Sequence, residues 1–165
     1  MASKKMKIPT TIDLGDQTRT AMVGLLQANL ADGIDLVYQL KQAHWTVRGP
    51  NFIGFHELLD QLHEQVEDKV DLTAERIAVL GGQAEGTVDV SAQTSRLPKY
   101  PLDAVKIEDH VAAVTKSLAA YAENVRKAID EASEAGDEGT ADLFTEISRA
   151  ADRARWFVEA HKVAA

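Results

Sequence analysis

The chain of 165 residues contains no cysteine, which excludes a disulfide framework, a thiolate metal site and a cysteine nucleophile. Proline occurs only four times, and aromatic residues make up 5% of the chain. No apolar run has the length that a membrane span requires, and residues 1–17 lack the apolar middle of a signal peptide. We therefore expect a cytoplasmic protein with no membrane partner.

Positive charge is also scarce, because 18 lysines and arginines face 26 aspartates and glutamates and leave a formal net charge of −8. A compact nucleic-acid binder is disfavoured, since its affinity comes from cations that meet phosphates. An acidic surface instead attracts metal cations. The length suits one domain, and the 45% of hydrophobic residues is typical of a packed core.

Apolar residues recur three and four positions apart in four long segments, the pattern of amphipathic helices. The predicted helices span about 16–45, 51–80, 103–135 and 137–163. Residues 83–103 connect the second predicted helix to the third. A connection of that length can run along a whole bundle and can form a short helix on the way. The sequence therefore predicts an all-α, ferritin-like four-helix bundle over residues 16–165, preceded by a flexible tail at residues 1–15.

Four possible metal ligands share one stripe of the second predicted helix. At about 100° per residue they lie at roughly 0°, 40°, 60° and 100° around its axis; they are His56, Asp60, Asp71 and Glu75. A solvated acidic face would account for the carboxylates alone, but it accounts less well for the histidine aligned with them. The turn at residues 49–50 folds the first helix back, so His44 can join His56 and Asp60.

Distance divides these ligands into two incomplete groups. His56 and Asp71 are 15 positions apart, which is about 22 Å along a straight helix, so one chain cannot place both at one small metal centre. Two antiparallel copies can bring the histidine group of one chain against Asp71 and Glu75 of the other. The stripe therefore predicts a two-fold dimer with two metal sites at its interface.

The ligand types narrow the metal without choosing it. Imidazole with carboxylate suits Fe(II), Mn(II), Zn(II) or Co(II), and of these iron is the choice that makes a redox enzyme. None of the five histidines has a glutamate three positions before it, so the Glu-x-x-His motif of an internal di-iron site is missing.

Four segments resemble the signatures of the Dps family, the small ferritin-like proteins that protect DNA in starved or oxidatively stressed bacteria. The segments are HWTVRGPNF at 44–52, HELLD at 56–60, DLTAERI at 71–77 and WFVEAH at 156–161. The resemblance implies a hollow dodecamer that oxidises Fe(II), commonly with hydrogen peroxide in preference to O2, and stores ferric mineral. It also implies a ferroxidase centre that takes three ligands from one subunit and two from its two-fold partner, namely His44, His56 and Asp60 with Asp71 and Glu75.

The same resemblance assigns roles outside the centre. The start of the last helix would line an acidic three-fold pore that admits iron, with Asp142 and Glu138 in the pore and Asp137 mainly as a helix cap. Trp45, beside His44, is expected to pack in the core near the centre, and electron donation to a stray oxidant is the alternative.

DNA contact would have to come from Lys4, Lys5 and Lys7 in the tail, multiplied by avidity across the assembly. Twelve copies at −8 each would carry −96 formal charges, and such a shell repels DNA. Two alternative functions stay open at this point. One is a non-enzymatic DNA-compacting nucleoid protein, and the other is a structural oligomer that holds zinc or manganese.

Overall fold

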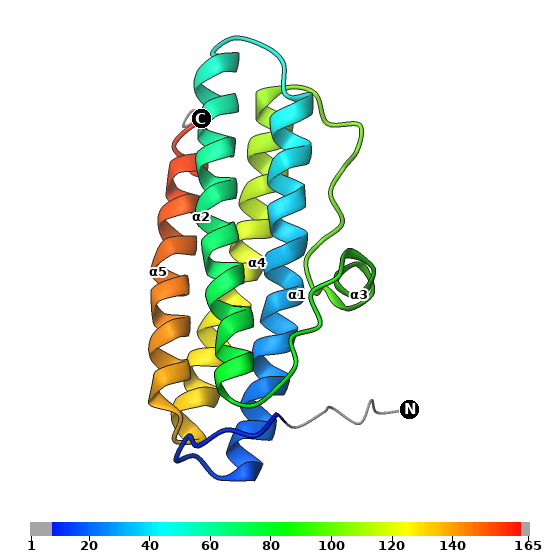
Figure 1. Cartoon of the computed structure of the whole chain (residues 1–165). Coiled ribbons are helices and arrows are strands. Elements are labelled where there is room, and N and C mark those ends of the chain that lie inside the picture. Colours follow the sequence, from blue (N-terminus) through cyan, green and yellow to red (C-terminus); the bar gives the residue numbers. More distant parts are fainter. Residues whose placement is uncertain (1–7, 163–165) are drawn as a thin grey trace.

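The computed structural model describes residues 8–162, and over this range the chain forms helices and no named strand. The helices are α1 (Asp16–Thr46), α2 (Phe52–Val79), α3 (Val88–Thr94), α4 (Ile107–Glu134) and α5 (Glu138–Glu159). Four long helices lie side by side, and α3 sits outside the bundle against α1 (Figure 1). The predicted four-helix bundle with a short helix in its crossover is confirmed.

The bundle consists of two helical hairpins. The short links at residues 47–51 and 135–137 join α1 to α2 and α4 to α5, and these are the pairs that pack most closely. Fully buried leucines, phenylalanines and isoleucines fill the space between the hairpins, including Leu26, Leu40, Leu62, Phe144 and Ile147. Within residues 8–162 no helix is long and apolar enough to cross a membrane.

The ends of two predicted helices differ from the structure. The third was expected from residue 103, but α4 begins at Ile107. Residues 103–106 continue the crossover, because the Ala104 N–H donates to Pro101 O and the Arg48 N–H donates to Val105 O at 2.8 Å. The last helix was expected to reach residue 163, but α5 ends at Glu159.

The tail ahead of α1 has described contacts from residue 8 onward. The Ile8 N–H donates to Gly81 O at 2.9 Å, and the Thr10 hydroxyl donates to Val79 O. Gly81 has φ +79°, and a Cβ there would lie 2.6 Å from Ile8 O, so the close approach requires glycine. The division into a flexible tail at 1–15 and a bundle at 16–165 stays a prediction.

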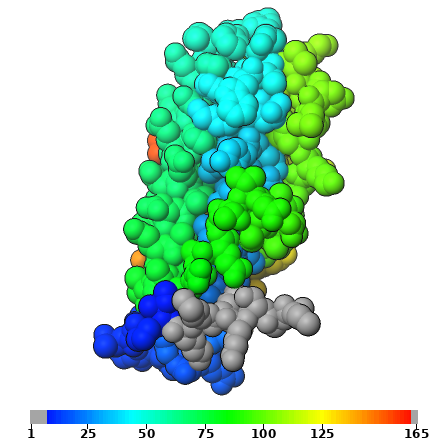
Figure 2. Space-filling model, turned by 45° about the vertical axis from the view of Figure 1, so that its right-hand side comes forward, coloured from blue at the N-terminus to red at the C-terminus, as the bar shows by residue number. Residues whose placement is uncertain are grey.

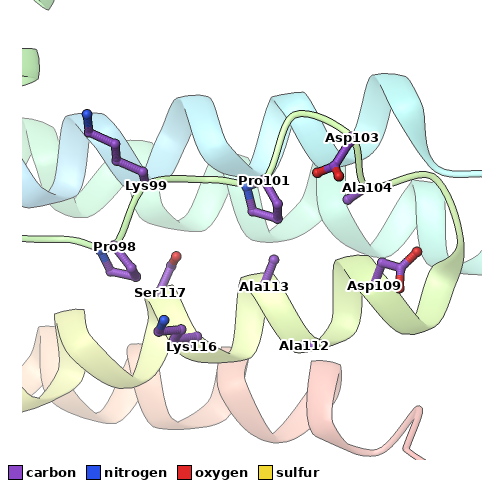
Figure 3. A pocket seen from close by; sticks show the side chains of 10 residues that line it. All are labelled: Pro98, Lys99, Pro101, Asp103, Ala104, Asp109, Ala112, Ala113, Lys116 and Ser117. Carbon is purple, nitrogen blue, oxygen red and sulfur yellow. The ribbon is translucent and has the colours of Figure 1, made fainter.

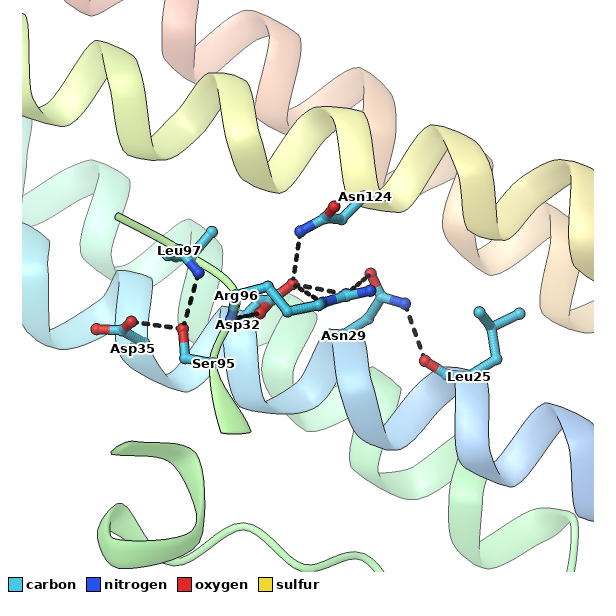
Figure 4. A network of polar contacts seen from close by, with 8 residues as sticks. All are labelled: Leu25, Asn29, Asp32, Asp35, Ser95, Arg96, Leu97 and Asn124. Atoms are coloured by element: carbon cyan, nitrogen blue, oxygen red, sulfur yellow. Dashed lines mark hydrogen bonds and ion pairs between the residues drawn. The ribbon is translucent and has the colours of Figure 1, made fainter. Parts of the chain in front are cut away.

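A buried carboxylate fastens the crossover to the bundle (Figure 4). Asp32 of α1 is fully buried, and Arg96 donates to it from its backbone N–H, its Nε and its Nη2 at 2.6–3.0 Å. Asn124 of α4 donates to the same carboxylate at 3.0 Å. Buried charges need such partners, because an unpaired one is costly in a low-dielectric interior. Asp32 therefore joins α1, α4 and the crossover.

A second polar contact, nearer the end of the crossover, joins it to α4. Tyr100 Oη lies 2.7 Å from His110 Nδ1, and His110 is fully buried at the start of α4. Burial lowers the pKa of His110, because the charged imidazolium loses its hydration there. Burial likewise raises the pKa of the Tyr100 hydroxyl. Both groups are therefore held neutral, which suits a hydrogen bond inside the bundle.

We predict that Arg96→Met lowers the free energy of unfolding by about 3 kcal/mol, since it leaves the Asp32 carboxylate buried without its cation. Urea unfolding followed by circular dichroism measures the change. Arg126→Met is the matched control, because Arg126 pairs with Asp152 at 3.0 Å on the surface and such pairs contribute about 1 kcal/mol or less. Equal losses in the two variants would contradict the role assigned to Asp32.

Candidate metal centre

The turn between α1 and α2 brings two of the predicted ligands together. His44 lies in the last turn of α1, and His56 lies in the second turn of α2. His44 Nδ1 lies 2.9 Å from His56 O, and His56 Nδ1 lies 2.9 Å from His44 O. The two rings stack with their centroids 3.6 Å apart and an interplanar angle of 22°. We call this reciprocal arrangement the histidine pair.

The histidine pair fixes which ring nitrogen is free. A backbone carbonyl can only accept a hydrogen bond, so the Nδ1 atom of each ring must carry the proton. In a neutral ring the Nε2 atom then has a free lone pair, the form in which imidazole binds a metal. Each backbone carbonyl thus selects, for the neutral ring of the other histidine, the tautomer that leaves Nε2 available to a metal.

Asp60, the third predicted ligand, lies one turn after His56 and has a cationic partner of its own. Lys41 Nζ of α1 forms an ion pair with Asp60 Oδ1. The hydrogen bond and charge of Lys41 lower the pKa of the Asp60 carboxyl. This contact was not predicted from the sequence, although Lys41 precedes His44 by three positions and therefore shares its helix face.

Asp71 and Glu75 lie apart from the histidine pair, as their spacing predicted. Because α2 is unbroken from Phe52 to Val79, Asp71 stays about 22 Å from His56 along the axis. Both carboxylates are exposed. Within residues 8–162 no three histidine, aspartate or glutamate side chains come close enough to hold one metal ion. The chain thus brings His44, His56 and Asp60 to one end of α2 and leaves Asp71 and Glu75 near the other.

Two further residues near the histidine pair differ in their surroundings. Trp45 is 58% exposed in the single chain, so the prediction that it packs in the core is wrong. The side of α1 that packs into the bundle carries Leu40 and Ala43, and Trp45 lies on the other side. His63 lies two turns after His56, and its Nδ1 is 3.3 Å from Val37 O. Its Nε2 lies 3.9 Å from Glu67 Oε2.

The start of α5 presents the acidic residues that were expected to line a pore. Asp137 is the N-cap and accepts from the Thr140 N–H at 3.0 Å, so its predicted capping role is confirmed. Glu138 and Asp142 are exposed and lie one turn apart, on the same face of the helix. Their role in a pore is untested by these contacts. Lys4, Lys5 and Lys7 lie outside the described residues.

A cavity of about 520 Å³ lies elsewhere, between the crossover and α4 (Figure 3). Lys99 and Lys116 line it together with Asp103 and Asp109. None of the predicted metal ligands borders it. The candidate centre on the α1–α2 hairpin therefore lies apart from this cavity. Figure 2 shows α3 standing out from α1 on one side of this hairpin.

Comparison with known proteins agrees with the fold and the signature segments. Residues 23–163 match the family model of the ferritin-like domain. The chain is 44% identical over 152 residues to the DNA protection during starvation protein of Agrobacterium fabrum, and the alignment covers 92% of this chain and 94% of that protein. The chain belongs to the Dps family.

Solved Dps structures superpose on nearly the whole chain. Mycobacterium smegmatis Dps in a tetragonal form has a TM-score of 0.91 at 33% identity and covers 97% of this chain and 96% of its own. Dps from Microbacterium arborescens in a high iron form has a TM-score of 0.84 at 33% identity, with 92% and 97% covered. The resemblance seen in four short segments therefore extends to the entire bundle.

Lys41→Gln should strengthen Fe(II) binding at the histidine half of the centre, because Lys41 occupies Asp60 and repels a second cation. Because exposed ion pairs are weak, we expect a modest affinity gain of about two- to fivefold. Anaerobic calorimetric titration with Fe(II) measures it. Lys127→Gln, which removes the surface pair with Glu123, is the control. Unchanged or weaker binding in Lys41→Gln would contradict the assignment of Asp60 as a ligand.

Proposed function

We propose that this Dps chain oxidises Fe(II) at centres shared between two-fold-related subunits, with hydrogen peroxide as the preferred oxidant. In each centre His44, His56 and Asp60 come from one subunit, and Asp71 and Glu75 come from its partner. The observation that carries the proposal is the division of ligands on α2, where each chain holds two partial sets that cannot meet within it. Membership of the Dps family supports iron storage and DNA protection as the wider role.

The reaction requires two ferrous ions near one peroxide molecule. Each Fe(II) gives one electron, so two Fe(II), one hydrogen peroxide and two protons yield two Fe(III) and two water molecules. Because both electrons arrive together, the peroxide is not split by one electron into a hydroxyl radical. The protein's carboxylates stabilise the rising charge of the substrate iron, and the fixed Nε2 atoms of the histidine pair set its position.

A two-fold dimer follows from the same division of ligands, and membership of the Dps family supports a larger shell. A two-fold dimer completes two centres, and we propose that six such dimers form a hollow dodecamer that stores ferric iron inside. Glu138 and Asp142 would admit Fe(II) at a three-fold pore, since exposed acidic groups concentrate cations. DNA protection then comes chiefly from removing iron and peroxide in the cytoplasm, because the net charge of −8 per chain opposes DNA binding.

The double variant His44→Ala/Asp71→Ala tests this function, since it removes one ligand from each partial set. Fe(II) is added without oxygen, hydrogen peroxide follows, and ferric absorbance is recorded. We expect peroxide-driven oxidation to fall at least about tenfold, toward the rate of protein-free iron.

His161→Ala/Asp130→Ala is the matched control, because it removes the same two residue types from exposed positions on α4 and just beyond α5. It should oxidise Fe(II) as the wild type does. A wild-type rate no faster than protein-free iron would overturn the function, and a double variant as fast as the wild type would overturn the ligand assignment.

A further inference from the structure

One arginine joins the end of α2 that carries Asp71 and Glu75 to the start of α5. Arg76 Nη2 lies 2.6 Å from Asp137 Oδ1, and Arg76 Nε donates to Thr140 Oγ1 at 3.0 Å. Its guanidinium therefore contacts both the N-cap residue of α5 and the residue three positions later. We call these contacts the Arg76 clamp.

The first turn of α5 is shaped to receive the guanidinium. A Cβ on Gly139 would stand 2.9 Å from Arg76 Nη2, closer than real Cβ contacts, so the guanidinium would have to move away from this turn. Asp137 is 2% exposed as a side chain, and it also accepts from the Thr140 N–H and hydroxyl. Arg76 thus holds a turn that is already capped, and what it adds is the position of that turn relative to α2.

Glu138 and Asp142 lie on this same turn and the next, and both are exposed. The position of their carboxylates in space therefore depends on where the first turn of α5 is held. Farther along, Lys69 Nζ of α2 lies 2.5 Å from Glu146 Oε1 of α5. That ion pair links the same two helices but touches neither the cap nor the first turn.

We infer that Arg76 is a positioning residue for the admission of Fe(II), because it holds the acidic first turn of α5 fixed against α2. This inference rests on the proposed function. Without the clamp the self-capped turn persists, but it can shift relative to α2, and Glu138 and Asp142 shift with it. The buried residues Thr73 and Ile77 still pack α2 into the bundle, which leaves the ligands of the centre in place.

Kinetics can distinguish a change in Fe(II) admission from damage to the centre itself. Weaker gathering of Fe(II) raises the Fe(II) concentration at half-maximal rate, while an intact centre keeps the maximal rate. Arg76→Gln removes the cation and its fork of donors. Gly139→Ala keeps every charge and inserts a methyl group where the guanidinium lies, although alanine is ordinarily favoured over glycine in a helix.

The experiment measures peroxide-driven oxidation by the assembled protein over a range of Fe(II) concentrations. We expect Arg76→Gln and Gly139→Ala each to raise the half-saturating concentration about tenfold, the lower range of effects that acidic surfaces have on cation encounter. The maximal rate should stay at the wild-type value. Lys69→Gln, the control on the same pair of helices, should leave both quantities unchanged.

Three results would overturn the inference: an unmoved half-saturating concentration, a maximal rate that falls in step with it, or an equal shift in Lys69→Gln. If Arg76→Gln does not assemble, Gly139→Ala decides the matter, because it keeps the ion pair's groups. An inactive wild type overturns the proposed function and this inference together. An active wild type with unmoved variants overturns this inference alone.

Discussion

The unbroken course of α2 from Phe52 to Val79 is the constraint on which the proposed function of this chain depends. A helix rises about 1.5 Å per residue, so the 15 positions between His56 and Asp71 become a separation of about 22 Å that no side-chain movement can close. Under the proposed function, each chain carries two partial sets of ligands, and a complete set needs a second chain. Fe(II) oxidation would then require the dimer, because no group of three possible ligands comes together within residues 8–162 of one chain.

Local contacts within one chain hold the residues of the proposed histidine half in place. His44 and His56 hold one another through backbone carbonyls, which fixes the free nitrogen of each ring. Lys41 pairs with Asp60 in the single chain and favours its ionised form, so the carboxylate must change partner to bind a metal. At the other end of α2, Arg76 holds the first turn of α5. These contacts place charges on a rigid bundle, whose crossover is fastened through the buried Asp32.

Much of this was predictable from the sequence, because apolar spacing and the residues that end helices are local signals. They predicted the four long helices and the crossover, which the structure confirms. The spacing of His56 and Asp71 on α2 predicted their separation, and the shared metal centre stays a prediction. The start of α4 was missed because contacts far along the chain hold residues 103–106, such as the Arg48–Val105 hydrogen bond. The burial of Asp32 was not predictable, because its partner Arg96 lies 64 positions away in the sequence. Trp45 was expected in the core because tryptophan is a large apolar residue. Residue type alone does not show which side of α1 faces outward, so its exposure in the single chain was not predicted.

Complementation between two inactive variants tests the shared centre most directly. His44→Ala subunits lack a ligand of the histidine half, and Asp71→Ala subunits lack a ligand of the carboxylate half. When both are produced together, each mixed dimer should contain one centre with both defects and one with none. Random pairing should therefore restore about a quarter of the wild-type centres and of the peroxide-driven oxidation rate, although each variant alone is inactive. A mixture as inactive as its parents would contradict a centre shared between subunits.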